Sequence, residues 1–258
     1  MFSQLIFRFF IFWYSCGLIL LTFDLLPPWL EWANTVFLLL TGLLGAIFFV
    51  TSYGYFIGLL ISFVVVTGTI FAEWVGVTYG ILFGHYFYNA DFGPKIIDVP
   101  ITIGFAWLMV IATTHVIGKT ISQHLFTQKW KQIALYLIIS PVAAVVMDLI
   151  LDPVAYKVKQ YWEWDGTGLY YGIPITNFVD WFIISLFLHI ILVFLVFHRP
   201  ICSHAWASRM VLLYALMVIM FMTIAAVATL WFAVGLSFVC TSLLLVLYFY
   251  SVRKKSVC

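Results

Sequence analysis

Long apolar runs along the chain are separated by short segments that hold nearly all of its polar residues. A run of about twenty apolar residues is long enough to cross the hydrocarbon core of a bilayer as a helix. The pattern predicts eight such spans: Leu5–Phe23, Thr35–Thr51, Tyr55–Ala72, Val99–Ile117, Ile133–Leu151, Phe182–Phe197, Met210–Ala228 and Phe232–Tyr250. The breaks at Tyr53–Gly54 and near Trp231 are the least marked, because no charged residue identifies a loop there.

Composition agrees with an all-α, polytopic bundle that forms a single integral membrane domain over residues 1–258. Hydrophobic residues make up 65% of the chain and charged residues only 9%, whereas charged residues are about a quarter of ordinary usage. The alternating segments of a membrane β-barrel are absent. No small-residue cleavage site follows the first apolar run, so we interpret that run as the first span.

The distribution of Lys and Arg predicts how the spans are oriented. With the N-terminus inside, nine of these residues fall on the cytoplasmic side: Arg8, Lys119, Lys129, Lys131, Arg199, Arg209, Arg253, Lys254 and Lys255. Only three fall outside, at Lys95, Lys157 and Lys159. Because cytoplasmic loops carry the excess of basic residues, we expect both termini inside the cell and a multi-pass protein of the cell membrane.

This orientation assigns all ten acidic residues to outer loops or outer helix ends: Asp24, Glu31, Glu73, Asp91, Asp98, Asp148, Asp152, Glu163, Asp165 and Asp180. Two interpretations remain open. The cytoplasmic loops are simply short and basic, or the acids line one site that opens at the outer leaflet.

The stretch Met147–Trp181 holds five of the ten acidic residues and three of the eleven Trp residues. Carboxylates against a membrane are costly, so we look for function there first. Asp148 and Asp152 are four residues apart and share one helix face. Two such carboxyls cannot both ionise easily, which predicts general acid–base chemistry. The alternative is a solvated pair at a helix end that Pro153 terminates.

A second polar segment follows the third predicted span. Glu73 lies where that span meets the loop, and an interfacial position would need no function. Gly76, Gly80 and Gly84 recur every four residues, a spacing typical of a helix face that packs closely. His85 is a candidate acid or ligand, although isolated histidines more often make structural hydrogen bonds.

Aromatic residues accompany both polar segments: Tyr86, Tyr88, Trp162, Trp164, Tyr170, Tyr171 and Trp181. One interpretation is an aromatic belt at the membrane interface. The other is a set of ring faces that stabilise a developing carbocation. Asn177 is a candidate helix N-cap, or a hydrogen-bonding partner for a water or a substrate hydroxyl.

The sequence gives little support for a metal site or a nucleic-acid-binding site. The remaining histidines form no metal-binding pair with an acid, and the four Cys residues are scattered, so we predict no metal site. No basic patch suits a nucleic acid.

The two polar segments together resemble the membrane-bound carotenoid biosynthesis proteins. That family includes carotenoid 1,2-hydratases acting on γ-carotene-type and bisanhydrobacterioruberin-type polyenes. The first resembling motif comprises Glu73, Gly76, Gly80, Phe83-Gly84, Tyr86, Tyr88, Val99-Pro100 and Trp107. The second comprises Asp148, Asp152-Pro153-Val154-Ala155, Trp162, Trp164, Gly168, Tyr170-Tyr171-Gly172, Pro174, Asn177 and Trp181. The chain departs from the family pattern at Tyr79, Leu82 and Asp180, where the family has Thr, Pro and Gly.

The resemblance implies cofactor-independent hydration of a terminal isoprenoid double bond to a tertiary alcohol. It implies that Asp148 or Asp152 is the acid and that the other, or Glu73, orients the water. The implied substrate-binding residues are Tyr86, Tyr88, His85, Trp162, Trp164, Tyr170, Tyr171, Asn177, Asp180 and Trp181. The partners it implies are a lipophilic polyene, membrane lipid and other carotenoid enzymes.

Two other functions remain as alternatives. Asp148-x-x-x-Asp152 has the form of a prenyltransferase motif that holds Mg²⁺ against a pyrophosphate, but the acids between Glu73 and Asp91 are too widely spread to supply its second half. A transporter or a scaffold for pigment enzymes is the other alternative. Transporters bury charge near the middle of the membrane, where these spans carry no acid.

Overall fold

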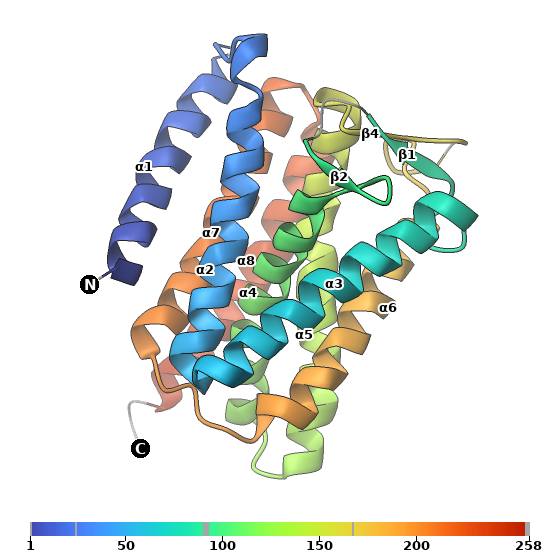
Figure 1. The fold of residues 1–258 in the computed structure, drawn as a ribbon. Helices are drawn as coiled ribbons and strands as arrows, with labels where there is room; N and C mark the ends of the chain where they lie inside the picture. The colour runs from blue at the N-terminus through green and yellow to red at the C-terminus, as the bar shows by residue number, and fades with distance from the viewer. Residues whose placement is uncertain (1, 24, 90–92, 167, 256–258) are drawn as a thin grey trace.

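The computed structural model describes residues 2–23, 25–89, 93–166 and 168–255 (Figure 1). Its helices are α1 (Phe2–Thr22), α2 (Trp32–Tyr53), α3 (Tyr55–Tyr79), α4 (Ile101–Leu125), α5 (Lys129–Pro153), α6 (Ile175–Leu192), α7 (His204–Val227) and α8 (Trp231–Lys255). Within the described residues, eight helices are long and apolar enough to cross a membrane. The all-α polytopic fold is therefore confirmed, and so are the breaks at Gly54 and before Trp231.

Shorter elements complete the chain. A 3₁₀ turn, η1, spans Pro28–Leu30, and the π-helical segments η2 (Val154–Val158) and η3 (Val193–Phe197) extend α5 and α6. The strands are β1 (Tyr86–Tyr88), β2 (Lys95–Ile96), β3 (Val99–Pro100) and β4 (Trp162–Trp164).

Several helices run beyond the ends that hydropathy predicts. The third span continues past Ala72 to Tyr79, and the sixth begins at Ile175 instead of Phe182. Polar residues are tolerated in these extra turns because other parts of the protein satisfy their hydrogen bonds. Glu73 is consequently a buried residue within α3, and its predicted position at the junction with a loop is wrong.

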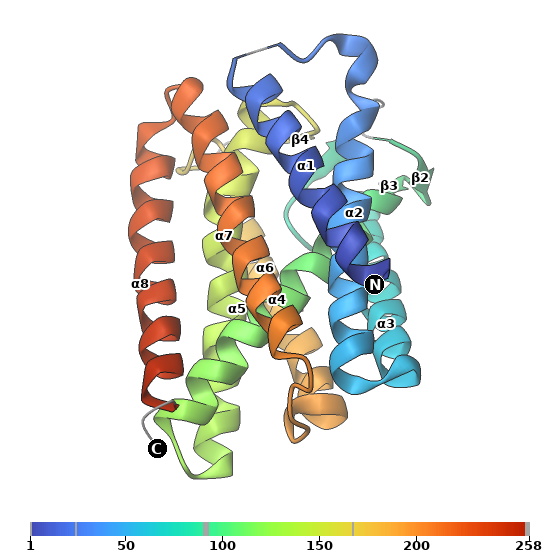
Figure 2. The ribbon, with the colours of Figure 1, turned by 90° about the vertical axis from the view of Figure 1, so that its left-hand side faces the viewer.

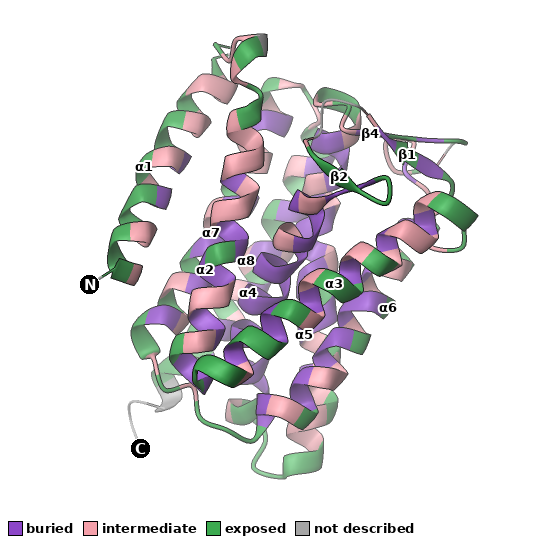
Figure 3. Cartoon of the chain, viewed as in Figure 1, coloured by how far each residue is buried: buried purple, intermediate pink, exposed green. Residues whose placement is uncertain are grey.

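The helix α4 forms the centre of the bundle, and Figure 3 shows it largely buried. Glycines let its neighbours approach closely. A Cβ on Gly42 of α2 would lie 2.6 Å from the carbonyl oxygen of Phe105 in α4, and one on Gly118 of α4 would meet the hydroxyl of Ser140 in α5. At the side of the bundle, α1 packs on α2 and α7 (Figure 2).

The two polar segments of the sequence are joined by a short antiparallel ribbon between β1 and β4. Tyr86 pairs with Trp164, and Tyr88 pairs with Trp162. In each strand the first and third residues are buried and the middle residue is exposed. The sequence analysis did not predict this ribbon, although the alternation in Tyr-Phe-Tyr and Trp-Glu-Trp has the period of a half-buried strand.

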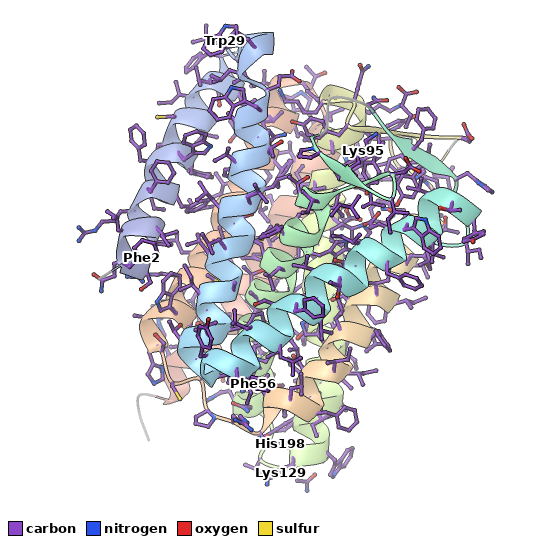
Figure 4. The ribbon with its side chains drawn as sticks, in the orientation of Figure 1. Phe2, Trp29, Phe56, Lys95, Lys129 and His198 are labelled. Atoms are coloured by element: carbon purple, nitrogen blue, oxygen red, sulfur yellow. The ribbon has the colours of Figure 1, made fainter. Side chains whose placement is uncertain are left out.

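The polar loops gather at one end of the bundle. In Figure 4, Trp29 and Lys95 lie at this end and Lys129 and His198 lie at the opposite end. Asp24 and Asp91 fall outside the described residues; the other eight acids belong to elements at or near the end that carries the ribbon. The inside location of both termini stays a prediction.

Candidate active site

Glu73 is held by three hydrogen-bond donors from two other elements, β1 and α4. Its side chain is only 6% exposed. Trp107 on α4 donates its indole N–H to Oε1 over 3.0 Å. Tyr88 donates its hydroxyl to Oε2 over 2.8 Å, and Tyr86 donates to the same oxygen. Because an indole N–H only donates, Oε1 must accept, which suits an ionised carboxylate.

Asp148 and Asp152 lie one turn apart near the end of α5, with exposures of 0% and 2%. The side-chain amide of Asn177 on α6 donates to Oδ2 of Asp148 over 3.1 Å and also to Oδ2 of Asp152. Within the described residues, Asp148 Oδ1 is buried without a hydrogen-bonding partner. This carboxyl pair is thus supplied with fewer donors than Glu73.

The structure excludes one sequence-based interpretation of the Asp148–Asp152 pair and one of Asn177. A solvated position at a helix end is wrong, because both carboxyls are buried and the chain continues from Pro153 into η2. The capping interpretation of Asn177 is also wrong. The residue that precedes α6 is Pro174, and the Asn177 amide binds carboxyl groups instead of a helix end.

One pocket brings the carboxyl groups together with aromatic rings; we call it the carboxyl pocket. Its empty volume, open side included, is about 450 Å³. Of the residues predicted from the sequence, it is lined by Glu73, Tyr86, Tyr88, Asp152, Trp162, Trp164, Asn177 and Trp181. Asp148 does not line it, and instead shares Asn177 with Asp152.

The aromatic residues of the ribbon cover this pocket. Tyr88 and Trp162 meet edge to face with ring centroids 5.9 Å apart, and the rings of Tyr86 and Trp164 are 6.4 Å apart. These four side chains and Trp181 are buried. A belt at the lipid interface is therefore the wrong interpretation for them, because their rings face protein.

Four of the predicted residues lie elsewhere. The Tyr170 hydroxyl donates to the carbonyl of Leu149 over 2.7 Å. The Tyr171 hydroxyl accepts from the backbone N–H of Ala233, in the first turn of α8, over 3.2 Å. Both contacts attach the loop before α6 to neighbouring helices, and neither residue lines the carboxyl pocket.

His85 and Asp180 also lie outside the pocket lining. The imidazole of His85 fills the place that a Cβ on Gly80 would take. Gly80 has φ +64° and follows the end of α3, so the three spaced glycines do not share one helix face. Asp180 accepts the backbone N–H of Phe83 over 2.7 Å, where Phe83 has φ +62°.

The sequence analysis did not assign several pocket residues. Trp107 belongs to the first resembling motif and was still not assigned to the site, although it binds Glu73 directly. Phe83 also belongs to that motif, and the others are apolar residues with no distinguishing local signal: Ile103, Ala106 and Leu151. Only the packing of α4 and α5 brings them to the pocket.

The two ribbon tyrosines remain neutral donors. Burial raises the pKa of Tyr86 and of Tyr88 well above the usual value of 10.0, and the nearby negative charge of Glu73 raises both further. Each hydroxyl therefore keeps its proton at neutral pH and continues to donate to Glu73.

Within the described residues, no group of three His, Cys, Asp or Glu side chains is arranged to hold a metal ion. No curated protein and no solved structure matches the chain. The sequence model of one family, described as carotenoid biosynthesis protein, matches residues 33–244, which include every residue of the carboxyl pocket. This multi-pass membrane protein therefore belongs to the carotenoid biosynthesis protein family and has a role in making carotenoids.

Proposed function

We propose that the protein is a carotenoid hydratase, which adds water to the terminal trisubstituted double bond of an acyclic carotenoid end. The observation that carries the proposal is the contrast between two acidic groups on one aromatic pocket. Glu73 has three donors and Asp152 belongs to a pair that shares one amide. A donor-rich carboxylate beside a donor-poor carboxyl pair provides a base and an acid in one site.

In this proposal Asp152 delivers the proton, because it lines the pocket and Asp148 does not. Two buried carboxyl groups that share Asn177 repel each other when both are ionised, so the pair retains one proton. The alkene π electrons take that proton at the less substituted carbon. A C–H bond forms, the Asp152 O–H bond breaks, and a tertiary carbocation remains.

The aromatic lining stabilises this cation. The rings of Tyr86, Trp162 and Trp164 line the pocket, and the electron-rich face of such a ring attracts a cation. Attraction between a cation and an aromatic ring contributes about 0.5–2 kcal/mol per well-placed ring. Ionised Glu73 adds an electrostatic contribution in the same enclosed site.

Glu73 orients the water as a hydrogen-bond acceptor. The water oxygen forms the new C–O bond, and the proton that it then loses returns to the carboxyl pair. The sum is alkene plus water giving a tertiary alcohol, and it needs neither a metal nor an organic cofactor. Lys and Arg are not among the described residues that line the pocket, which disfavours a pyrophosphate substrate and hence the prenyltransferase alternative.

The test is conservative substitution in a host that makes acyclic carotenes. Asp152→Asn should reduce the yield of hydroxylated carotenoid by about 10²–10⁴-fold, the usual contribution of a general acid. Glu73→Gln and Asp148→Asn should also reduce it. If all three variants keep the wild-type yield, the proposed site is wrong.

Glu163→Gln is the matched control, since Glu163 is exposed on the middle of β4, between the two buried Trp residues. It should leave the yield unchanged. Purified protein should also convert an acyclic carotene in detergent with a chelator present and heavy-oxygen water as solvent. Label in the tertiary alcohol is expected, and dependence on Mg²⁺ and a prenyl pyrophosphate would overturn the proposal.

A further inference from the structure

Two further cavities adjoin the carboxyl pocket. The middle cavity shares Ile103, Ala106, Leu151 and Trp162 with the carboxyl pocket as common walls. The α1 cavity, which lies against α1, shares Leu21, Asn34, Phe37, Tyr161 and Met220 with the middle cavity. The three cavities therefore lie next to one another in a series from α1 to Asp152.

The lining residues change between acidic and apolar along this series of cavities. Among the described residues, the carboxylic acids that line the series lie at its two ends: Glu73 and Asp152 in the carboxyl pocket and Glu31 in the α1 cavity. The middle cavity is lined mainly by apolar residues such as Phe37, Val154 and Ile224, and its polar lining residues are Asn34, Lys159 and Tyr161. A ligand that fills the series is thus hydrocarbon along its length and reactive at its end.

The α1 cavity lies at the edge of the bundle. Gly17 and Leu21 of α1 form part of its wall, and α1 has the smallest buried share among the described spans. Most of α1 therefore lies against the bilayer, so a route beside α1 would bring a hydrophobic ligand to this cavity without crossing water. At Gly17 an added Cβ would meet nothing within 4 Å, so the wall has unfilled space there.

We propose that the three cavities form one channel that binds the polyene chain, which enters from the bilayer beside α1 and extends its end to Asp152. This inference rests on the proposed function for the chemistry at the end of the channel. The carboxyl pocket is one short space at the end of the series, with an empty volume of about 450 Å³ that includes its open side. A carotenoid is much longer, so the rest of the chain needs the adjoining cavities.

The decisive variant is Gly17→Phe, which fills the α1 cavity at a position where the new Cβ meets no neighbour. Gly68→Phe is its matched control. Gly68 is an exposed residue of α3, its added Cβ also meets nothing within 4 Å, and it lines none of the three cavities. Both variants replace a helical glycine by the same side chain, so a general effect on folding appears in both.

A second variant blocks the channel farther in. Ala106→Phe places a ring in the wall between the middle cavity and the carboxyl pocket. Ala134→Phe is its control, because Ala134 is an exposed residue of α5 that lines none of the three cavities.

Binding is measured with an achiral acyclic carotene whose terminal double bonds have been saturated, so that no hydration can occur. In lipid nanodiscs, binding to a chiral site induces circular dichroism in the visible band of the polyene. Gly17→Phe and Ala106→Phe should weaken binding by about tenfold or more, the effect of keeping roughly two methylene groups from burial. The two control variants should bind as the wild type does.

Activity provides a separate readout. Gly17→Phe should still hydrate a short acyclic terpene with the same trisubstituted end, because that substrate needs only the carboxyl pocket. The channel is overturned if Gly17→Phe and Ala106→Phe both bind the saturated carotene as tightly as their controls. If instead binding falls as expected but no variant or wild-type protein hydrates either substrate, the channel stands and the proposed reaction fails.

Discussion

Trp107 and Trp181 are stacked, with ring centroids 4.1 Å apart and planes 25° from parallel. The stack joins α4 to α6 and holds the Trp107 indole where its N–H reaches Glu73. An aromatic pair of this kind contributes about 0.5–1.5 kcal/mol beyond its buried area. The stack thereby couples the orientation of the Glu73 carboxylate to the packing of two spans.

Trp107→Phe should keep a ring against Trp181 while removing the donor to Glu73 Oε1. A buried acceptor that loses its donor costs about 1–3 kcal/mol, which corresponds to a reduction in hydration rate of roughly tenfold to a hundredfold. Trp181→Phe is the comparison, because it alters the same stack and retains the N–H. Equal losses of kcat in the two variants would contradict a specific role for the hydrogen bond.

The protein should lose stability at alkaline pH because of Tyr88. Its pKa is raised well above 10.0 in the folded protein by burial and by Glu73, whereas in the unfolded chain it ionises near pH ~10. Stability from this group is complete below about pH 10 and is lost as the pH rises toward the folded pKa, by about 1.4 kcal/mol per pH unit.

Thermal unfolding measured from about pH 9 upward tests this expectation. Tyr88→Phe should lower stability at neutral pH, and its alkaline decline should be shallower by one proton equivalent, so that the difference from the wild type shrinks as the pH rises. An unchanged slope would mean that Tyr88 ionises equally in both states.

Asp180 should stabilise the loop between α3 and β1 and should not contact the substrate. It accepts the N–H of Phe83, whose carbonyl in turn accepts the indole N–H of Trp164 over 3.0 Å. Asp180→Ala should lower the melting temperature and raise KM, with a smaller effect on kcat. Asp180→Asn keeps an acceptor oxygen and should restore most of both values. Loss of kcat in Asp180→Asn comparable to that in Asp152→Asn would instead make Asp180 part of the proton chemistry.

Gly42 should not tolerate even a methyl group. A Cβ there would lie 2.6 Å from the Phe105 carbonyl oxygen, so α2 and α4 would have to separate. Gly42→Ala should destabilise the protein by about 1–3 kcal/mol, as overpacking usually does. Gly235→Ala, where an added Cβ meets nothing within 4 Å, should be neutral or slightly stabilising. The comparison is made by melting temperature in detergent.

Hydropathy was enough to predict the spans, because a chain in lipid must satisfy its backbone hydrogen bonds within each helix. It did not predict where α3 ends or where α6 begins, since Glu73 and Asn177 obtain their hydrogen bonds from other helices. The β1–β4 ribbon depends on pairing between segments far apart in sequence, and a local pattern specifies no partner.

The carboxyl groups themselves could be found from sequence, because an acid in an apolar chain is costly and seldom incidental. Their neighbours were harder to assign. Tyr170 and Asp180 look like site residues by type, yet each hydrogen-bonds a backbone group. Nothing in the sequence separates a side chain that binds backbone from one that faces a cavity.

The ribbon also has a consequence for when the protein becomes reactive during its assembly. Glu73 and β1 precede α4, whereas Asp152 and β4 follow it, so neither half of the chain contains both acidic groups. A nascent chain with only its first four spans inserted has no partner strand for β1 and no Asp152. If Asp152 is the proton donor, as we propose, the site is complete only after the second half of the chain docks, and an unfinished chain has no acid with which to protonate the unsaturated lipids around it.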